Sequence, residues 1–148
     1  MPARVNWQNR GAIGERISEL SRRVSNLAPL VEPVRRILID GNRERSLAGT
    51  DVNGVPFAPV KPSTMLRRGG DGPPLAPRRA GSREVTGYTV DVRTGGGSLT
   101  FTASWPDQPW MEYHHTGTPR MPKRDPYGFR EVDLEAVRAL LREHIVKR

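Results

Sequence analysis

The chain has no cysteine among its 148 residues. Without thiols it can form no disulfide framework, no thiolate zinc site and no cysteine nucleophile. Aromatic residues are also scarce, with three Trp, three Tyr and three Phe. This supply is small for a protein that binds nucleic acid by stacking bases on aromatic rings.

Long apolar runs are absent as well, since none exceeds three residues, as at Ile37–Ile39. A transmembrane helix needs about 20 consecutive apolar residues. The first residues also lack the apolar core of a secretory signal. The sequence therefore predicts a soluble protein that is not exported and has no membrane partner.

The composition is basic and rich in loop-forming residues. A length of 148 residues predicts a single domain over residues 1–148, with a flexible N-terminus over 1–11. Glycine and proline supply 29 residues, so much of the chain is expected to be loop. A net charge of +8 suits nucleic acid, an anionic surface or acidic protein partners.

Apolar periodicity predicts a first helix near the N-terminus. Its stripe is Ile13, Ile17, Leu20, Val24 and Leu27, at the 4-3-4-3 spacing that places side chains on one helix face. The acidic and basic residues on the other faces include both favourable and unfavourable i,i+4 pairs. We therefore expect this helix to owe its stability to docking.

A second helix is predicted from about Pro33 to Leu47, because proline is tolerated in a first helical turn. The expected buried face is Leu30, Val34, Ile37, Leu38 and Leu47. Four arginines are expected to project outward or toward a partner: Arg35, Arg36, Arg43 and Arg45. Gly41 lies inside this helix and predicts a kink or a break there.

Residues 49–87 are expected to form one long irregular segment, because prolines and glycines interrupt every period. Within it, residues 61–83 contain six basic residues against one acidic residue, a local charge of +5. Loops of this length are usually functional or disordered.

Alternating residues predict a β-hairpin over 88–105, with its turn at Thr94–Ser98. Leu99, Phe101, Ala103 and Trp105 share the face expected to pack on helices. Tyr113–Thr116 is expected to add a short strand.

A last helix is predicted over 133–145, with acidic residues early and basic residues late, as the helix dipole favours. The expected fold class is α+β, with two N-terminal helices and one C-terminal helix packed on a small antiparallel sheet, and a long basic loop.

The search for catalytic motifs centres on His114 and His115. If Tyr113–Thr116 is extended, adjacent histidines point to opposite faces and cannot both bind one ion. His144 has no histidine four residues away, and no zinc motif is recognisable. Gly95–Gly97 lacks the Gly-Lys-Ser/Thr of a phosphate loop, and no Gly-x-Ser-x-Gly elbow is present. The sequence nominates no enzyme.

Several short motifs follow one another in a fixed order. They are Gly54-Val55-Pro56-Phe57-Ala58-Pro59-Val60, Thr64, Pro74-Leu75, Tyr113-His114-His115-Thr116-Gly117, Met121-Pro122-Lys123-Arg124 and Gly128. In this order, over residues 13–147, the chain resembles the phage virion morphogenesis proteins, the Mu-like tail-completion family. It departs from that pattern in having Phe57 for a tryptophan, His115 for a glutamine and Asp125-Pro126-Tyr127 for Pro-Phe-Leu.

This resemblance implies a non-enzymatic structural protein of the virion that completes the tail or joins it to the head. It implies a ring of identical subunits without a cofactor, made in the host cytoplasm. The implied partners are other neck and tail proteins, such as the tail tube and the head–tail connector, and genome DNA passing through the ring. The structural motif positions are Gly54, Phe57, Pro59, Thr64, Leu75, Gly117, Met121, Pro122 and Gly128.

The residues themselves give a physical account of these motifs. Phe57 between two prolines is expected to anchor an extended loop, and Gly117 permits a positive φ. Prolines after Gly117 keep the next segment extended, so that its basic residues are displayed toward partners. The candidate interface residues are Arg67, Arg68, Arg78, Arg79, His115, Arg120, Lys123 and Arg124.

Three other interpretations stay open at this point. The proline-rich stretch is also consistent with a plain connector into the last helix. The charge is consistent with a basic module that binds nucleic acid without sequence specificity. A hydrolase built on His114 or His115 is the third interpretation.

Overall fold

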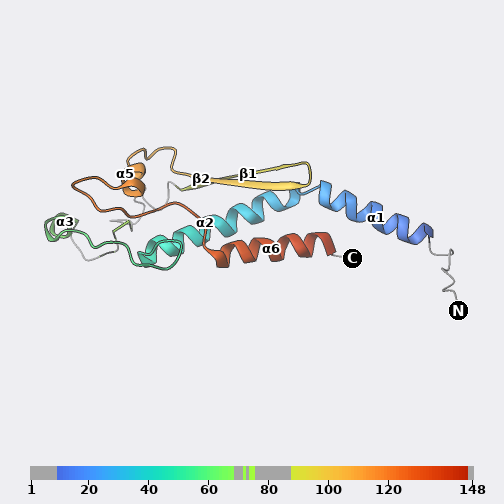
Figure 1. Cartoon of the computed structure of the whole chain (residues 1–148), viewed down its shortest axis with the longest axis horizontal. Helices are drawn as coiled ribbons and strands as arrows, with labels where there is room; N and C mark the ends of the chain where they lie inside the picture. The colour runs from blue at the N-terminus through green and yellow to red at the C-terminus, as the bar shows by residue number, and fades with distance from the viewer. Residues whose placement is uncertain (1–9, 69–71, 73, 76–87, 147–148) are drawn as a thin grey trace.

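A computed structural model describes residues 10–68, 72, 74–75 and 88–146 of the chain. The elements in chain order are α1 (Arg10–Ser25), a 3-10 turn η2 (Ala28–Leu30), α2 (Val31–Ala48), α3 (Pro62–Arg68), β1 (Thr89–Gly95), β2 (Ser98–Ser104), α5 (Met111–Thr116) and α6 (Glu131–Val146). The molecule is elongated, with α1 at one end and α3 and α5 at the other (Figure 1). Helices and a two-stranded antiparallel sheet together confirm the predicted α+β class.

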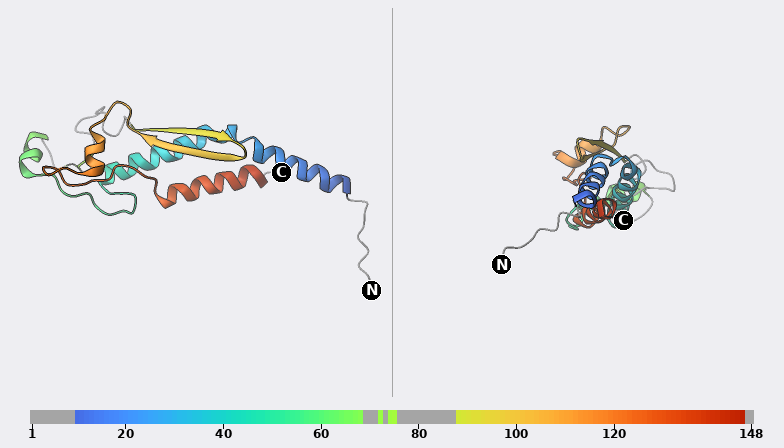
Figure 2. Two further views of the ribbon diagram at one scale, coloured as in Figure 1. Left: turned by 45° about the horizontal axis from the view of Figure 1, so that its top comes forward. Right: turned by 90° about the vertical axis from the view of Figure 1, so that its right-hand side faces the viewer.

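The central part has three layers, in which α2 lies between the β-hairpin and α6 (Figures 1 and 2). Val34 and Leu38 of α2 and Val137 of α6 belong to one hydrophobic core with Val90 and Val92 of β1. The Arg35 Nε atom also donates a hydrogen bond of 3.1 Å to the Val90 carbonyl. The sheet and α6 are thus fixed to opposite sides of one long helix.

The predicted hairpin is confirmed in position and in facing. Thr89 pairs with Ser104 and Gly95 with Ser98, around a turn at Gly96 and Gly97. In β1 the valines are buried and alternate with exposed polar residues. In β2 Leu99, Phe101 and Ala103 pack against the core, and Trp105 beyond it is buried.

The second helix differs from the sequence-based expectation at four points. It begins at Val31 and runs without a break through Gly41, whose missing side chain makes room for the Asp133 carboxylate of α6. Leu47 is exposed, although it was expected on the buried face. Arg45, expected to project outward, is only 2% exposed. The buried face of α2 therefore continues past Gly41 to Arg45 and Ser46.

The first helix is present, but only its last turns dock. Val24 lies beside the hairpin turn at Gly97, and Leu27 enters the core. Ile13 and Ile17 are 57% and 62% exposed, and every residue from 11 to 18 is exposed. The apolar stripe therefore continues well beyond the part of the molecule that covers it. Residues 10 and 11, expected in a flexible N-terminus, begin this helix, and residues 1–9 lie outside the described residues.

The long segment after α2 is less irregular than expected. A left-handed Gly49 ends α2, and α3 follows with Pro62 as its first residue and Thr64 inside it. Proline suits that position because the first helical amide has no acceptor within the helix. Leu75 is buried, whereas residues 76–87 lie outside the described residues. The last helix is confirmed, with bounds slightly wider than predicted.

Candidate functional site

The predicted motifs meet at the end of the molecule opposite α1. There the turn over residues 49–59 lies against residues 117–128, which follow α5 and which we call the 117–128 segment (Figure 1). The turn is closed by a hydrogen bond of 2.8 Å from the Phe57 amide to the Gly49 carbonyl. Phe57 itself is buried, as expected for an anchor, but it is not a member of the main hydrophobic core.

Arg124 joins the two stretches of chain. Its Nε donates to the Ala58 carbonyl at 2.6 Å, and its guanidinium also donates to the Pro59 carbonyl at 2.8 Å. Its backbone amide donates to the His114 carbonyl at 2.7 Å. With 7% of its surface exposed, Arg124 is not displayed toward a partner as expected. It instead donates to two carbonyls of a stretch of chain that has no helix or sheet to supply backbone donors.

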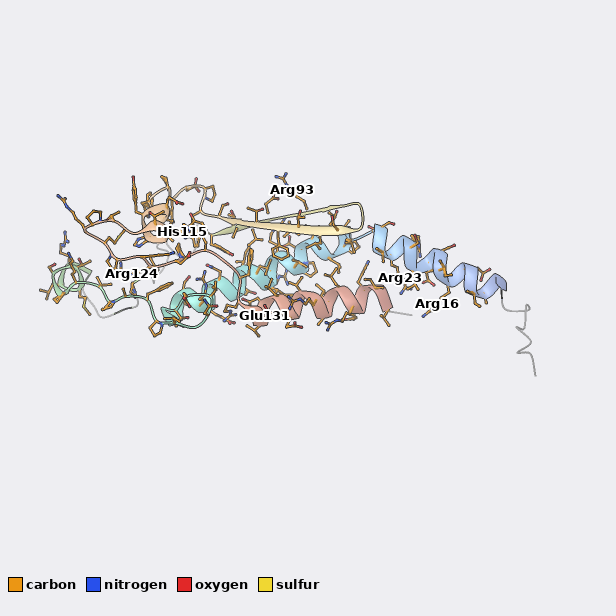
Figure 3. The ribbon with its side chains drawn as sticks, viewed as in Figure 1. Arg16, Arg23, Arg93, His115, Arg124 and Glu131 are labelled. Atoms are coloured by element: carbon orange, nitrogen blue, oxygen red, sulfur yellow. The ribbon has the colours of Figure 1, made fainter. Side chains whose placement is uncertain are left out.

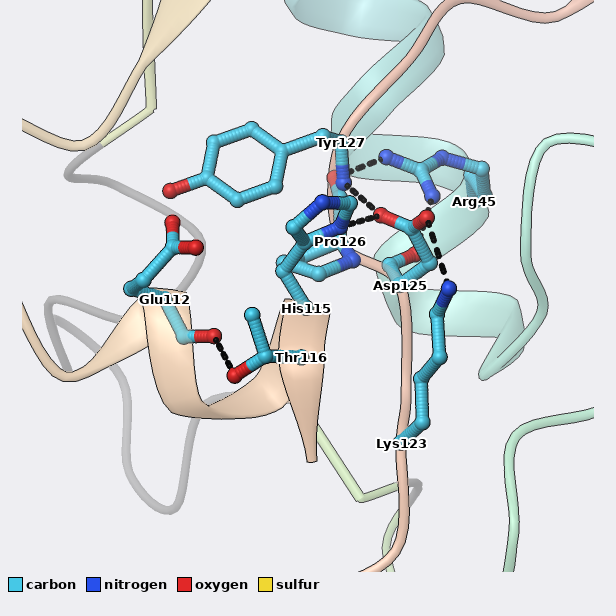
Figure 4. A network of polar contacts seen from close by, with 8 residues as sticks. All are labelled: Arg45, Glu112, His115, Thr116, Lys123, Asp125, Pro126 and Tyr127. Carbon is cyan, nitrogen blue, oxygen red and sulfur yellow. Dashed lines mark hydrogen bonds and ion pairs between the residues drawn. The ribbon is translucent and has the colours of Figure 1, made fainter. Parts of the chain in front are cut away.

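Arg45 reaches the same segment from inside the protein (Figure 4). Its guanidinium donates to the carbonyls of Asp125, at 3.3 Å, and of Pro126. Burial lowers the pKa of Arg45, and the nearby Tyr88 and Asp125 oppose that shift. Helical spacing could have found this residue, since Val34, Leu38, Gly41 and Arg45 repeat the 4-3-4 pattern of a buried face.

His115 lies beside Asp125, with 2.8 Å between its Nδ1 and Oδ1 of the carboxylate (Figure 4). The same oxygen accepts the Tyr127 amide at 3.1 Å, and Lys123 Nζ lies 4.0 Å from the other oxygen. The His115 and Tyr127 rings meet edge to face at 5.2 Å. Burial first, and then Glu112 and Asp125, raise the pKa of Tyr127. Asp125 therefore organises the local backbone as well as the histidine.

Two glycines of the predicted motifs are required by the backbone. Gly117 has a φ of 76°, and a Cβ there would lie 3.1 Å from the Lys123 amide nitrogen. Gly128 has a φ of 99°, and a Cβ there would lie 2.8 Å from Val52 Cγ1. Residues other than glycine rarely adopt such φ values. The positive φ predicted at Gly117 is thus confirmed.

Residues 113–116, predicted as a strand, form most of α5 instead. The helix is favoured locally because Pro109 and Trp110 precede it and Gly117 ends it with an amide bonded to the Tyr113 carbonyl. The argument that the two histidines point to opposite faces of a strand is therefore wrong. Among the described residues, no group of three His, Asp or Glu side chains is placed to hold a metal ion.

The candidate interface residues separate into distinct groups. Arg67, Arg120 and Lys123 are exposed, and His115 is half-buried on Asp125. Arg68 ends α3, while Arg78 and Arg79 lie outside the described residues. The remaining motif positions are an exposed Gly54, Pro59 and Pro122, and a half-buried Thr64 and Met121. Met121 pairs with Thr118 in a small antiparallel bridge.

Sequence reasoning missed Asp125 and Tyr127 as members of this site. A chain of edge-to-face rings links Tyr127 to Trp105 at 5.1 Å, and Trp105 to Tyr88 at 4.8 Å. The 117–128 segment is therefore attached to the core, and Arg120 and Lys123 are presented from a fixed backbone. No single sequence pattern marks such a convergence of distant rings.

Comparisons with protein-family models, with curated proteins and with solved structures found no match to this chain. Among the described helices, none combines the length and apolar character that crossing a bilayer requires.

Proposed function

We propose that this chain is a non-enzymatic structural component of a phage virion, which completes the tail or joins it to the head as a ring of identical copies. Its partners in this proposal are further copies of itself, the tail tube and the head–tail connector, with genome DNA passing through the ring. Its place is the tail or neck of the virion, after assembly in the host cytoplasm.

The observation that carries this proposal is the convergence of the ordered motifs. Residues 54–59, 114–117 and 121–124 are far apart in sequence and carry the resemblance to tail-completion proteins. They contact one another through Arg124, and Gly128 fits closely against the same turn. A set of motifs that builds one structural unit is expected if the family pattern describes a shared architecture.

The chemistry of this unit suits docking to a protein. The bonds of Arg124 and Arg45 fix the backbone, and Arg120 and Lys123 extend from it into solvent. Because the backbone that carries them is already fixed, binding to carboxylates on a neighbouring subunit requires ordering only of the arginine and lysine side chains themselves. The hydrogen bonds that build the unit end on backbone carbonyls and on Asp125, which favours a scaffold over an acid–base site.

The test is electron microscopy of a lysate from the producing phage or prophage after deletion of this gene. Full heads lying apart from unjoined or irregularly long tails are the expected result. Complementation with the Arg120→Ala, Lys123→Ala double variant is expected to leave many particles unjoined. Arg93→Ala, an exposed arginine on the hairpin, serves as the matched control and is expected to restore joined particles. Normal infectious particles after deletion would overturn the proposal.

A further inference from the structure

Residues 11–18 of α1, which we call its free half, are all exposed, and they include the two apolar side chains Ile13 and Ile17. Ile13 and Ile17 lie on the same helix face as Val24, which lies beside the hairpin turn, and the stripe leads to Leu27, which is buried in the core. In Figures 1 and 2 the beginning of α1 extends past the hairpin and past the end of α6. A helical stretch of ten residues or fewer is marginal in water without packing. This half of α1 therefore lacks a surface to pack on within the described part of one copy.

A matching surface lies on the outer side of α6. Val132, Ala136, Ala139 and Val146 are all exposed and lie on one helix face, turned away from the buried Val137. Their positions, with Glu143 between the last two, follow the 4-3-4-3 spacing of the α1 stripe. Two adjacent alanines leave shallow holes between valines, into which β-branched isoleucines can pack as knobs.

The charges beside the two stripes are opposite in sign. Within α1 there are four basic and two acidic residues, whereas α6 has two arginines and four carboxylates. Next to the α1 stripe, Arg16 is exposed and has no ion-pair partner among the described residues. Next to the α6 stripe, Glu131 and Glu135 share the single guanidinium of Arg138, which leaves one negative charge in excess.

One copy cannot bring these charges together. Arg16 lies on the part of α1 near and beyond the last turn of α6, while Glu131 begins α6 at its other end (Figure 3). Among the described residues of one copy, α1 and α6 meet near the ends of both helices, where His144 Nε2 lies 2.9 Å from the carbonyl oxygen of Asn26, just after α1. That contact uses the inner side of α6 and leaves the outer stripe uncovered.

We propose that the free half of α1 docks on the outer face of α6 of a second copy of this chain. The isoleucines pack over Ala136 and Ala139, and Arg16 approaches the excess carboxylate of Glu131 and Glu135. Each copy has one free α1 and one free α6 face, so the contact is head-to-tail and leads to a closed ring or an open chain. The inference rests on the proposed ring of identical copies and names the contact that forms it.

Cysteine cross-linking of the purified full-length protein tests this contact directly, because the natural chain has no cysteine. Ile17→Cys and Ala139→Cys are made in separate chains, one with a size tag, and mixed under mild oxidation. The expected product is a mixed disulfide between the two. The matched control pairs Ile17→Cys with Thr100→Cys, an exposed position on the outer face of the hairpin. Equal cross-linking of both pairs, or of neither, would overturn the proposal.

Charge reversal gives a second and independent measurement. Arg16→Glu and Glu135→Arg are each expected to weaken self-association about tenfold in light scattering. The double variant restores opposite charges between copies and is expected to recover most of the loss. Circular dichroism of each variant separates lost association from lost folding. Failure of the double variant to recover association would contradict the contact between α1 and α6.

These outcomes separate this inference from the proposed function. A specific cross-link, together with normal particles after gene deletion, would support the contact between copies and overturn the proposed role in the virion. Unjoined particles after deletion, together with no specific cross-link, would retain the virion role and place the ring contact elsewhere.

Discussion

Arg45 and Arg124 are the residues that give the far end of the molecule its shape. Each guanidinium donates to two backbone carbonyls from chain segments remote in sequence. Arginine suits this task because its planar fork offers several donors in fixed directions. A buried carbonyl that loses its donor costs the free energy of desolvating it.

Arg124→Gln is expected to lower the free energy of unfolding by about 2–3 kcal/mol, because it leaves the Ala58 and Pro59 carbonyls without a charged donor. Chemical denaturation measures this loss. Hydrogen exchange should also show faster exchange of the residue 124 amide, which is bonded to His114. Arg120→Gln is the control, since that side chain is exposed and is expected to change neither quantity. Equal stability of the two variants would contradict the assigned role.

Gly41 is the second residue with a defined structural task. A Cβ there would lie 2.3 Å from Asp133 Oδ2, and that carboxylate accepts two hydrogen bonds from Arg130. Gly41→Ala is expected to destabilise the protein by about 1–3 kcal/mol through overpacking. Gly14→Ala has no atoms within 4 Å of the new Cβ and should stabilise α1 by up to about 1 kcal/mol. Thermal or chemical denaturation that ranks them the other way would refute this account.

Tyr88 predicts how stability responds to alkali. Burial raises the pKa of the Tyr88 hydroxyl above its ordinary value of 10.0, with Arg45 opposing the shift. Its neutral form is favoured by folding, so this stabilisation is complete below pH 10 and declines as the pH rises further. Tyr88→Phe should therefore flatten the pH dependence of unfolding above pH 10. Tyr113→Phe, at an exposed position, is the control and should leave the wild-type profile unchanged.

At the scale of elements, α1 and α2 contrast in how they obtain their stability. Val34 and Leu38 of α2 are buried between the sheet and α6, so packing holds that helix through Gly41. The first half of α1 has the clearer apolar stripe, yet no described element of the same copy covers it. Apolar periodicity predicts which face of a helix packs against another surface. Only the tertiary structure shows whether that surface belongs to the same chain.

Leu38→Ala is expected to cost about 2–5 kcal/mol of unfolding free energy, because it opens a cavity in the core. Ile17→Ala, at 62% exposure, is expected to cost less than about 0.5 kcal/mol in the monomer. Denaturation at a protein concentration low enough to keep copies apart measures both. A large loss for Ile17→Ala under those conditions would mean that α1 docks within its own chain.

At the scale of the whole molecule, the net charge of +8 is also consistent with the alternative function, non-specific binding of nucleic acid, and the salt dependence of binding tests it. Binding that depends on phosphate contacts weakens log-linearly with salt, whereas association with an apolar centre persists. Light scattering is expected to show self-association that is reduced but retained when salt is raised. Fluorescence anisotropy with a labelled DNA duplex is expected to show only weak binding that salt removes. Tight DNA binding with no self-association would favour the alternative function.

The individual helices and strands could be predicted from the sequence because each depends on a pattern among neighbouring residues. Alternation over 88–105 predicted the hairpin with the correct face, and helical spacing predicted both long helices and α6. Local signals were weaker for short elements. The six residues of α5 were expected as a strand, and α3 was hidden among prolines. A helix of one or two turns has too few positions for its period to be recognised.

By itself the sequence determined the α+β class, the positions of the long elements and the order of the motifs, since these depend on neighbouring residues and on turn chemistry. Only the tertiary structure decided that Arg45 and Arg124 are buried, that Asp125 organises the 117–128 segment and that no described element covers half of α1. Each of these features depends on which carbonyl or side chain from a remote part of the sequence lies next to the residue in space. Residue spacing along the chain does not contain that information.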